Sequence, residues 1–183
     1  MKKLLSLLSI IFLLQTANAQ QKAKSAANIL TDAYKHADAG NKNVFVIFHA
    51  SWCGWCHRMD SSMLDKKCKK FFDANYVIVH LTVEESTDKK NLENPGGAEL
   101  KKTYLGEKAG LPFWIILNKK GKLLADSYIR KKGVSINEAG DNTGCPAAEN
   151  EVAYFISVLK KTSALSKSDL SIIAKRFREN EAK

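Results

Sequence analysis

Two cysteines separated by two residues, Cys53 and Cys56, are the residues of this sequence best suited to chemistry. They directly follow an apolar run at 44–48 that is typical of a strand buried on both faces, and a helix is predicted to begin at about Cys53. Unpaired N–H groups and the dipole at a helix N-terminus stabilise a thiolate. We therefore expect Cys53 to be an exposed nucleophile. Cys56, one turn later, is expected to be shielded and to resolve a mixed disulfide by thiol–disulfide exchange.

The segment Trp52-Cys53-Gly54-Trp55-Cys56, with Gly110-Leu111-Pro112 later in the chain, resembles the thioredoxin family. The resemblance is nearest to secreted bacterial thioredoxin-like and thiol:disulfide interchange proteins, and it covers residues 25–160. It implies an α/β thioredoxin fold, with a central mixed sheet and helices on both faces. It also implies a cis bond before Pro112, disulfide-containing protein substrates and no organic cofactor. The residues expected to bind substrate are Trp52, Gly54, Trp55, Leu111 and Pro112.

Three features depart from plain thioredoxin. Ile47 stands where the family often has a buried Asp that assists proton transfer to the second cysteine, so this step needs water or another group. Trp55 replaces the usual Pro between the cysteines, and the chain from Cys56 to Pro112 is longer, with an insertion expected at 84–97. A reductase is the favoured direction, although these departures prevent the direction of electron flow from being transferred from the family.

The remaining cysteines, Cys68 and Cys145, are predicted to form a structural disulfide if Cys53 and Cys56 are the redox pair. The alternative is that one of them is an auxiliary redox thiol. His57 follows Cys56 and could lower a thiol pKa as a cation, or could be a solvated helix residue. His49 could lie near the site, with packing as its alternative role.

Two other functions compete with disulfide exchange. Cys53, Cys56, Cys68 and His57 offer sulfur and nitrogen ligands for zinc, but zinc sites usually combine two ligand doublets and this sequence has one, so no metal is expected. A binding module with a merely structural disulfide is the second alternative, because a fold alone does not determine function. The intact cysteine pair together with Pro112 favours the enzyme.

The N-terminal segment predicts export. Lys2 and Lys3 precede an apolar run at 4–14, and Ala17-Asn18-Ala19 follows, which indicates a signal peptide over residues 1–19. The run is too short for a membrane span, so we expect a periplasmic or otherwise extracytoplasmic protein without stable membrane insertion. A membrane or periplasmic redox partner would then exchange electrons with it.

Composition is that of a folded chain. With 183 residues, 45% hydrophobic residues and three Pro, collagen-like and disordered classes are excluded. The formal net charge is +10, but the lysines are spread along the chain, so we expect a solvated surface and no nucleic-acid partner.

Periodicity predicts the elements that position the cysteines. A helix is expected over 26–37 and is ended by Gly40. A second helix is expected from about Cys53 to Phe72, with an interruption near Asp65. A second buried strand is expected at 76–83, parallel to the first. A short helix at 99–104, a hairpin at 113–117 and 122–126, an irregular segment at 127–144 and a helix at 152–159 follow. The C-terminal extension, 161–183, carries a last helix begun by a Ser166–Asp169 capping box. This helix is expected to dock on the domain, with a membrane-surface role as its alternative.

Overall fold

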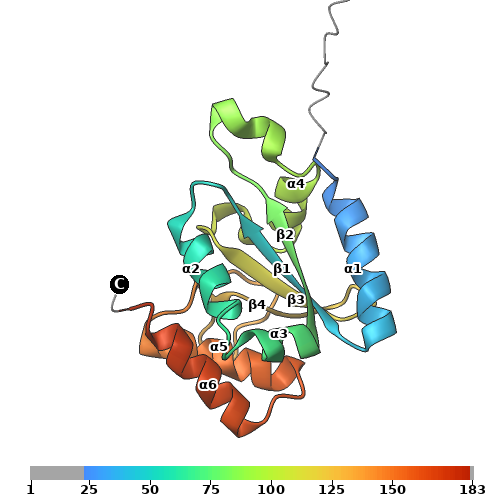
Figure 1. The fold of residues 1–183 in the computed structure, drawn as a ribbon. Coiled ribbons are helices and arrows are strands. Elements are labelled where there is room, and N and C mark those ends of the chain that lie inside the picture. The colour runs from blue at the N-terminus through green and yellow to red at the C-terminus, as the bar shows by residue number, and fades with distance from the viewer. Residues whose placement is uncertain (1–22, 182–183) are drawn as a thin grey trace, which may run out of the picture.

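A four-stranded mixed sheet forms the centre of the computed structural model, which describes residues 23–181 (Figure 1). The strand order is β2-β1-β3-β4, with β1 and β2 parallel and the other neighbours antiparallel. The strands are β1 (Asn43–His49), β2 (Tyr76–Thr82), β3 (Phe113–Leu117) and β4 (Leu123–Asp126). This arrangement confirms the predicted parallel pair, the hairpin and the mixed sheet. The predicted signal peptide lies outside the described residues.

The helices follow the predicted order. They are α1 (Ala26–Gly40), α2 (Gly54–Met63), α3 (Lys69–Asn75), α4 (Gly97–Thr103), α5 (Glu149–Thr162) and α6 (Lys167–Arg178), with short 3₁₀ turns η1 (Thr87–Leu92) and η2 (Gly106–Lys108). The first helix ends at Gly40, as expected. The left-handed cap conformation belongs to the next residue, Asn41, because Asn can take the place that glycine often fills.

Successive side chains of β1 point to opposite faces of the sheet and divide the core into two layers. Phe45 and Ile47 face a cluster that includes residues of α2, α3, α5 and α6, whereas Val44, Val46 and Phe48 face a cluster that includes residues of α1. Both faces of the strand are therefore covered, which explains why its sequence is continuously apolar. Figure 1 shows α1 on the opposite side of the sheet from α5 and α6.

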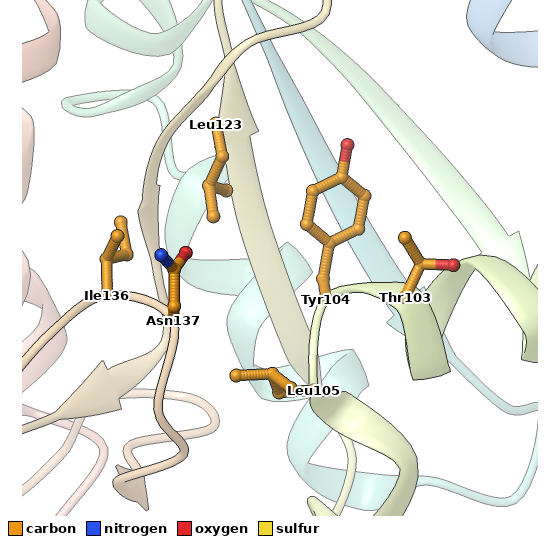
Figure 2. A pocket seen from close by; sticks show the side chains of 6 residues that line it. All are labelled: Thr103, Tyr104, Leu105, Leu123, Ile136 and Asn137. Carbon is orange, nitrogen blue, oxygen red and sulfur yellow. The ribbon is translucent and has the colours of Figure 1, made fainter.

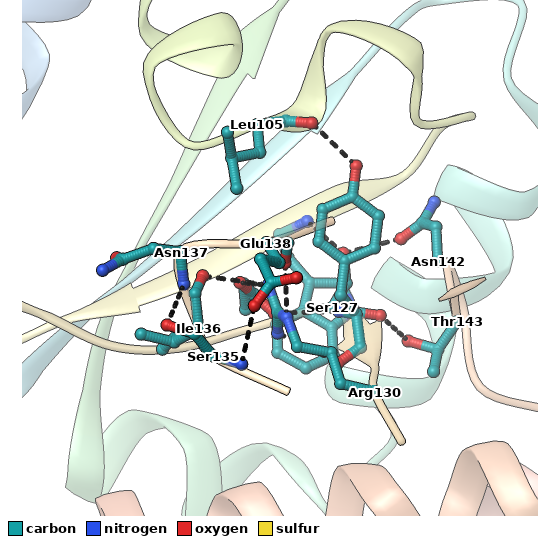
Figure 3. Close-up of polar contacts among 12 residues, drawn as sticks. Leu105, Ser127, Arg130, Ser135, Ile136, Asn137, Glu138, Asn142 and Thr143 are labelled. Carbon is teal, nitrogen blue, oxygen red and sulfur yellow. Dashed lines mark hydrogen bonds and ion pairs between the residues drawn. The ribbon is translucent and has the colours of Figure 1, made fainter. Parts of the chain in front are cut away.

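The segment predicted to be irregular, 127–144, contains a small two-stranded sheet, β5 (Tyr128–Ile129) with β6 (Asp141–Asn142). The loop between them is held by Arg130, whose guanidinium forms two bonds, of 2.7 and 2.6 Å, with the buried carboxylate of Asp126. The same guanidinium donates to the carbonyls of Ile136 and Glu138 (Figure 3). These side-chain hydrogen bonds hold a loop whose sequence predicts no regular helix or strand.

The last helix, α6, is part of the core. Leu170, Ile173 and Phe177 are buried in the same cluster as α2, α3 and α5, which confirms docking on the domain, and the Ser166–Asp169 capping box is present. Among residues 23–181, no helix has both the length and the apolar character needed to cross a membrane.

We predict that Phe177→Ala lowers the free energy of unfolding by about 3–5 kcal/mol, because it removes a fully buried aromatic ring and leaves a cavity. Urea denaturation followed by circular dichroism measures this. Ile172→Ala, at a half-exposed position on the same helix, is the control and should change stability by about 0.5 kcal/mol or less. Equal stabilities of the two variants would show that α6 is dispensable for the fold.

Candidate active site

Cys53 and Cys56 form a disulfide at the start of α2. Cys53 is the N-cap of this helix, and its sulfur accepts a hydrogen bond from the Cys56 amide at 3.1 Å. The pair therefore lies at the positive end of a ten-residue helix, as predicted. The expected exposure of Cys53 is wrong for this disulfide state, because Cys53 is 2% exposed and Cys56 is 1% exposed. Both pack against Ala50 and the partly buried Leu111.

The two tryptophans beside the disulfide lie largely on the surface, with Trp52 59% exposed and Trp55 45% exposed. Each has a local partner: the Trp52 indole N–H donates to the Glu84 carbonyl at 2.8 Å, and the Arg58 guanidinium lies 4.5 Å from the Trp55 ring centroid. A Cβ built on Gly54 would meet no atom within 4 Å. The surface at Gly54, between the two cysteines in the chain, is thus open and flanked by exposed aromatic rings.

The Leu111–Pro112 peptide bond is cis, and Leu111 contacts the cysteine pair. Within the part of the chain that the structure describes, the Leu111 amide and carbonyl have no hydrogen-bond partner. The amide of Asn142 holds the loop on either side of Leu111, since it donates to the Gly110 carbonyl at 2.8 Å and the Pro112 carbonyl at 3.3 Å. Leu111 therefore presents free backbone groups from a fixed loop.

Two residues that sequence reasoning assigned only to a polar insertion, Glu84 and Glu85, contact the segment before Cys53. The Glu85 carboxylate accepts from the Ser51 amide at 2.6 Å and from the Ser51 hydroxyl at 2.8 Å. Burial raises the pKa of Glu85, but the Ser51 hydrogen bonds outweigh this effect and the pKa lies below its usual value. A signal was available: Glu84 and Glu85 follow β2, and the carboxyl ends of parallel strands meet at one sheet edge.

Glu84 is fixed from α4. It has a left-handed backbone conformation, φ 55°, which non-glycine residues seldom adopt. The buried Lys101 ammonium lies 2.6 Å from the Glu84 carboxylate and also donates to the Ala109 carbonyl at 2.7 Å. Through its own carbonyl, Glu84 then positions the Trp52 indole.

Cys68 and Cys145 are both buried free thiols, so the predicted disulfide between them is wrong. Cys68 lies before α3, whereas the Cys145 sulfur contacts the Asn180 amide beyond the end of α6, at 3.5 Å. Burial raises the pKa of both thiols, for Cys145 to about 12. At neutral pH they remain protonated and are poor nucleophiles.

The histidines lie around the cysteine helix. His57, exposed, places Nε2 3.1 Å from the Ser51 carbonyl oxygen. His49, half-buried, lies with Nε2 3.2 Å from the Thr82 hydroxyl, and its ring packs edge-on against His80 with centroids 5.1 Å apart. His80 in turn lies 2.8 Å from a carboxylate oxygen of Asp60 on α2. Sequence reasoning missed this His80–Asp60 contact.

The ligands considered for zinc are not gathered in one place, since Cys53 and Cys56 are bonded to each other and Cys68 belongs to the turn before α3. Across residues 23–181, no group of three or more His, Cys, Asp or Glu side chains is placed to hold a metal ion.

One surface hollow adjoins the disulfide. It measures about 340 Å³ and is lined by Trp55, Leu111, the segment 142–145 and Glu151. A second hollow, of about 370 Å³, lies between the end of α4 and the loop after β5, and none of its lining residues is a predicted site residue (Figure 2). The first hollow is thus the one that brings Trp55 and Leu111 together beside the cysteines.

Comparison with known proteins agrees with this geometry. A family model described as a thioredoxin-like domain matches residues 30–134. A search of curated proteins finds no match.

The solved structures that resemble this chain include a disulphide isomerase from Xylella fastidiosa Temecula1, which is 22% identical in sequence. The match covers 55% of this chain and 72% of the isomerase chain, with a TM-score of 0.46. A DsbH oxidoreductase is 22% identical and covers 80% of this chain and 92% of its own, with a TM-score of 0.43. The oxidised C-terminal domain of Neisseria meningitidis DsbD is 19% identical and covers 57% of this chain and 84% of its own, with a TM-score of 0.38.

The thioredoxin-like domain model spans more than half of the chain and includes both bonded cysteines and Pro112. The chain therefore belongs to the thioredoxin-like domain family and has a thioredoxin-like fold with a close cysteine pair.

Proposed function

We propose that this protein exchanges disulfides with protein substrates through the Cys53–Cys56 couple and acts as a reductase. The observation that carries the proposal is the position of the disulfide, at the N-cap of α2 and against Leu111. A helix N-terminus stabilises the thiolate that exchange requires. The free backbone groups of Leu111 beside it offer an extended substrate chain hydrogen bonds.

The reaction begins from the dithiol form. The Cys53 thiolate attacks one sulfur of a substrate disulfide, and the substrate's other sulfur leaves as a thiolate. Cys56 then attacks Cys53, which re-forms the disulfide seen in the structure and releases the reduced substrate. Two electrons pass from the cysteine pair to the substrate, so a dithiol reductant must restore the pair after each cycle.

The substrate chain is proposed to lie on Leu111 and Pro112 and to enter the hollow between Trp55 and the segment 142–145. The exposed Trp52 and Trp55 rings and the open surface at Gly54 would receive apolar side chains around the substrate cysteine. Asn142 supports this role by fixing the loop, so that the free groups of Leu111 are held in place before binding.

We further propose that the protein is exported and works in the periplasm or another extracytoplasmic compartment. The charged, apolar and small-residue pattern of residues 1–19 supports this. Such a compartment is oxidising, so a reductase there needs a membrane or periplasmic partner that supplies electrons.

We predict that Cys53→Ser abolishes disulfide exchange, because no nucleophile remains at the helix N-terminus, and that Cys56→Ser accumulates mixed disulfides. Reduction of insulin by dithiothreitol, with non-reducing electrophoresis, measures both. Cys68→Ala is the control and should keep its activity, since that thiol is buried and protonated. Turnover retained by Cys53→Ser would contradict the assignment, and no turnover in the unaltered protein would favour a binding module.

The reduction potential of the Cys53–Cys56 couple tests the direction. If the protein is a reductase, equilibration with dithiothreitol should give a reduction potential near that of thioredoxin, about −270 mV. A value nearer about −120 mV would instead identify an oxidant that donates disulfides. Peptide mapping in the same samples should find Cys68 and Cys145 as free thiols, which shows that the measured potential belongs to Cys53 and Cys56 alone.

We predict that Glu85→Ala lowers the rate of disulfide exchange by about tenfold to a hundredfold, because the turn before Cys53 loses both bonds to Ser51. Glu85→Gln keeps a carbonyl acceptor, so its rate of disulfide exchange should fall less than that of Glu85→Ala. It should also lower the pKa of the Cys53 thiol, since a nearby negative charge is removed, as measured by thiolate absorbance. Asp88→Asn, exposed in the same insertion, is the control. Unchanged rates in Glu85→Ala would refute a positioning role.

A further inference from the structure

Resolution of the mixed disulfide requires a base, and this inference rests on the proposed function. Cys56 attacks Cys53 as a thiolate. However, Cys56 is almost fully buried, and burial favours the protonated thiol. Ile47, on the strand that leads to the cysteines, is apolar and packs in the core with Met59 of α2. The proton must therefore pass to water or to another group near this face of α2.

A row of three titratable side chains lies between this helix and the ends of β1 and β2. Asp60 is one helical turn after Cys56, so the two share a face of α2. The Asp60 carboxylate contacts Nε2 of His80 at 2.8 Å, and the His80 ring contacts the His49 ring. His49 is two residues after Ile47 on β1 and thus faces the same side of the sheet. Figure 1 shows a short loop leading from the end of that strand to α2.

The His49 ring is suited to accept a proton. Among the described residues, its hydrogen-bond partner is the Thr82 hydroxyl, at Nε2, which leaves Nδ1 for proton exchange. Burial lowers the pKa of His49, and the neighbouring His80 lowers it further, whereas Asp60 and Glu85 act in the opposite direction and His57 adds a small lowering. The imidazole is consequently neutral near neutral pH.

We propose that His49 accepts the Cys56 proton, directly or through one water molecule, while Cys56 resolves the mixed disulfide, and that His80 and Asp60 are positioning residues for His49. As the S–H bond of Cys56 breaks, its proton passes to Nδ1. The Cys56 thiolate forms a bond to the Cys53 sulfur, and the bond from Cys53 to the substrate breaks. The departing substrate thiolate carries the electron pair of that bond and takes up a proton, which returns His49 to its neutral form through solvent.

The test separates the two steps in a single turnover of the full chain, previously reduced with dithiothreitol. The protein is mixed with an aromatic disulfide whose thiolate product is coloured. Attack by Cys53 releases the first coloured thiolate, and resolution by Cys56 releases the second. The Cys53→Ser variant gives the background from Cys68 and Cys145. Absence of the first phase in the unaltered protein would overturn the proposed function and this inference together.

We predict that His49→Gln slows the second phase about a hundredfold at neutral pH and leaves the first phase within about twofold. In the unaltered protein the second rate should rise as His49 loses its proton and level off above the lowered pKa of that residue. In His49→Gln it should rise only at alkaline pH, with ionisation of the Cys56 thiol itself. His36→Gln, exposed on α1, is the matched control and should leave both phases unchanged. A second phase in His49→Gln with unaltered rate and pH profile would overturn the proposal.

His80→Gln and Asp60→Asn keep the inference testable if His49→Gln does not fold. Removal of His80 should move the pH midpoint of the second phase upward, because that residue lowers the pKa of His49. Removal of the Asp60 charge should move the midpoint downward. A merely structural role would not produce opposite shifts, so shifts in the same direction, or none, would count against the relay.

Discussion

Parallel pairing of β1 with β2 is the constraint on which the site depends. The register joins His49 to Thr82 at the carboxyl ends of both strands, so the residues that follow, Ser51 on one side and Glu85 on the other, meet at one sheet edge. The Glu85 carboxylate then fixes the turn from which α2 begins. The cysteine pair takes its place from this junction: a strand buried on both faces ends, and a helix N-terminus begins with Cys53 as its cap.

All four cysteines are buried, and their positions relative to helix α2 divide them into two kinds. Cys68 and Cys145 lie among apolar side chains, where the cost of burying a charge keeps them protonated. Cys53 is buried as well, but its sulfur accepts an amide hydrogen bond at the positive end of a helix. What distinguishes Cys53 from the other buried cysteines is its position, because its sulfur caps a helix N-terminus, where a thiolate is stabilised.

Several elements were predictable because their signals are local. The apolar run at 44–48, the hairpin around Gly121 and the capping box before α6 each depend on residues close in the chain, and all are present. The errors were of another kind. A disulfide between Cys68 and Cys145 was inferred from the number of cysteines, which carries no information about distance. The exposure of Cys53 was inferred from its helix position, which does not report that Ala50 and Leu111 pack against the cysteine pair.

The sequence by itself determined the chemistry and its place in the chain: a cysteine doublet at a strand-to-helix junction, with Pro112 as a distant partner. Only the tertiary structure decided which groups surround that doublet. Glu85 reaches Ser51 and Asp60 reaches His80 across gaps of 34 and 20 residues. Such contacts follow from strand register and helix packing, which are properties of the whole core rather than of any segment. Carboxylates and imidazoles have no periodicity that marks their partners, so their roles become visible once the sheet is assembled.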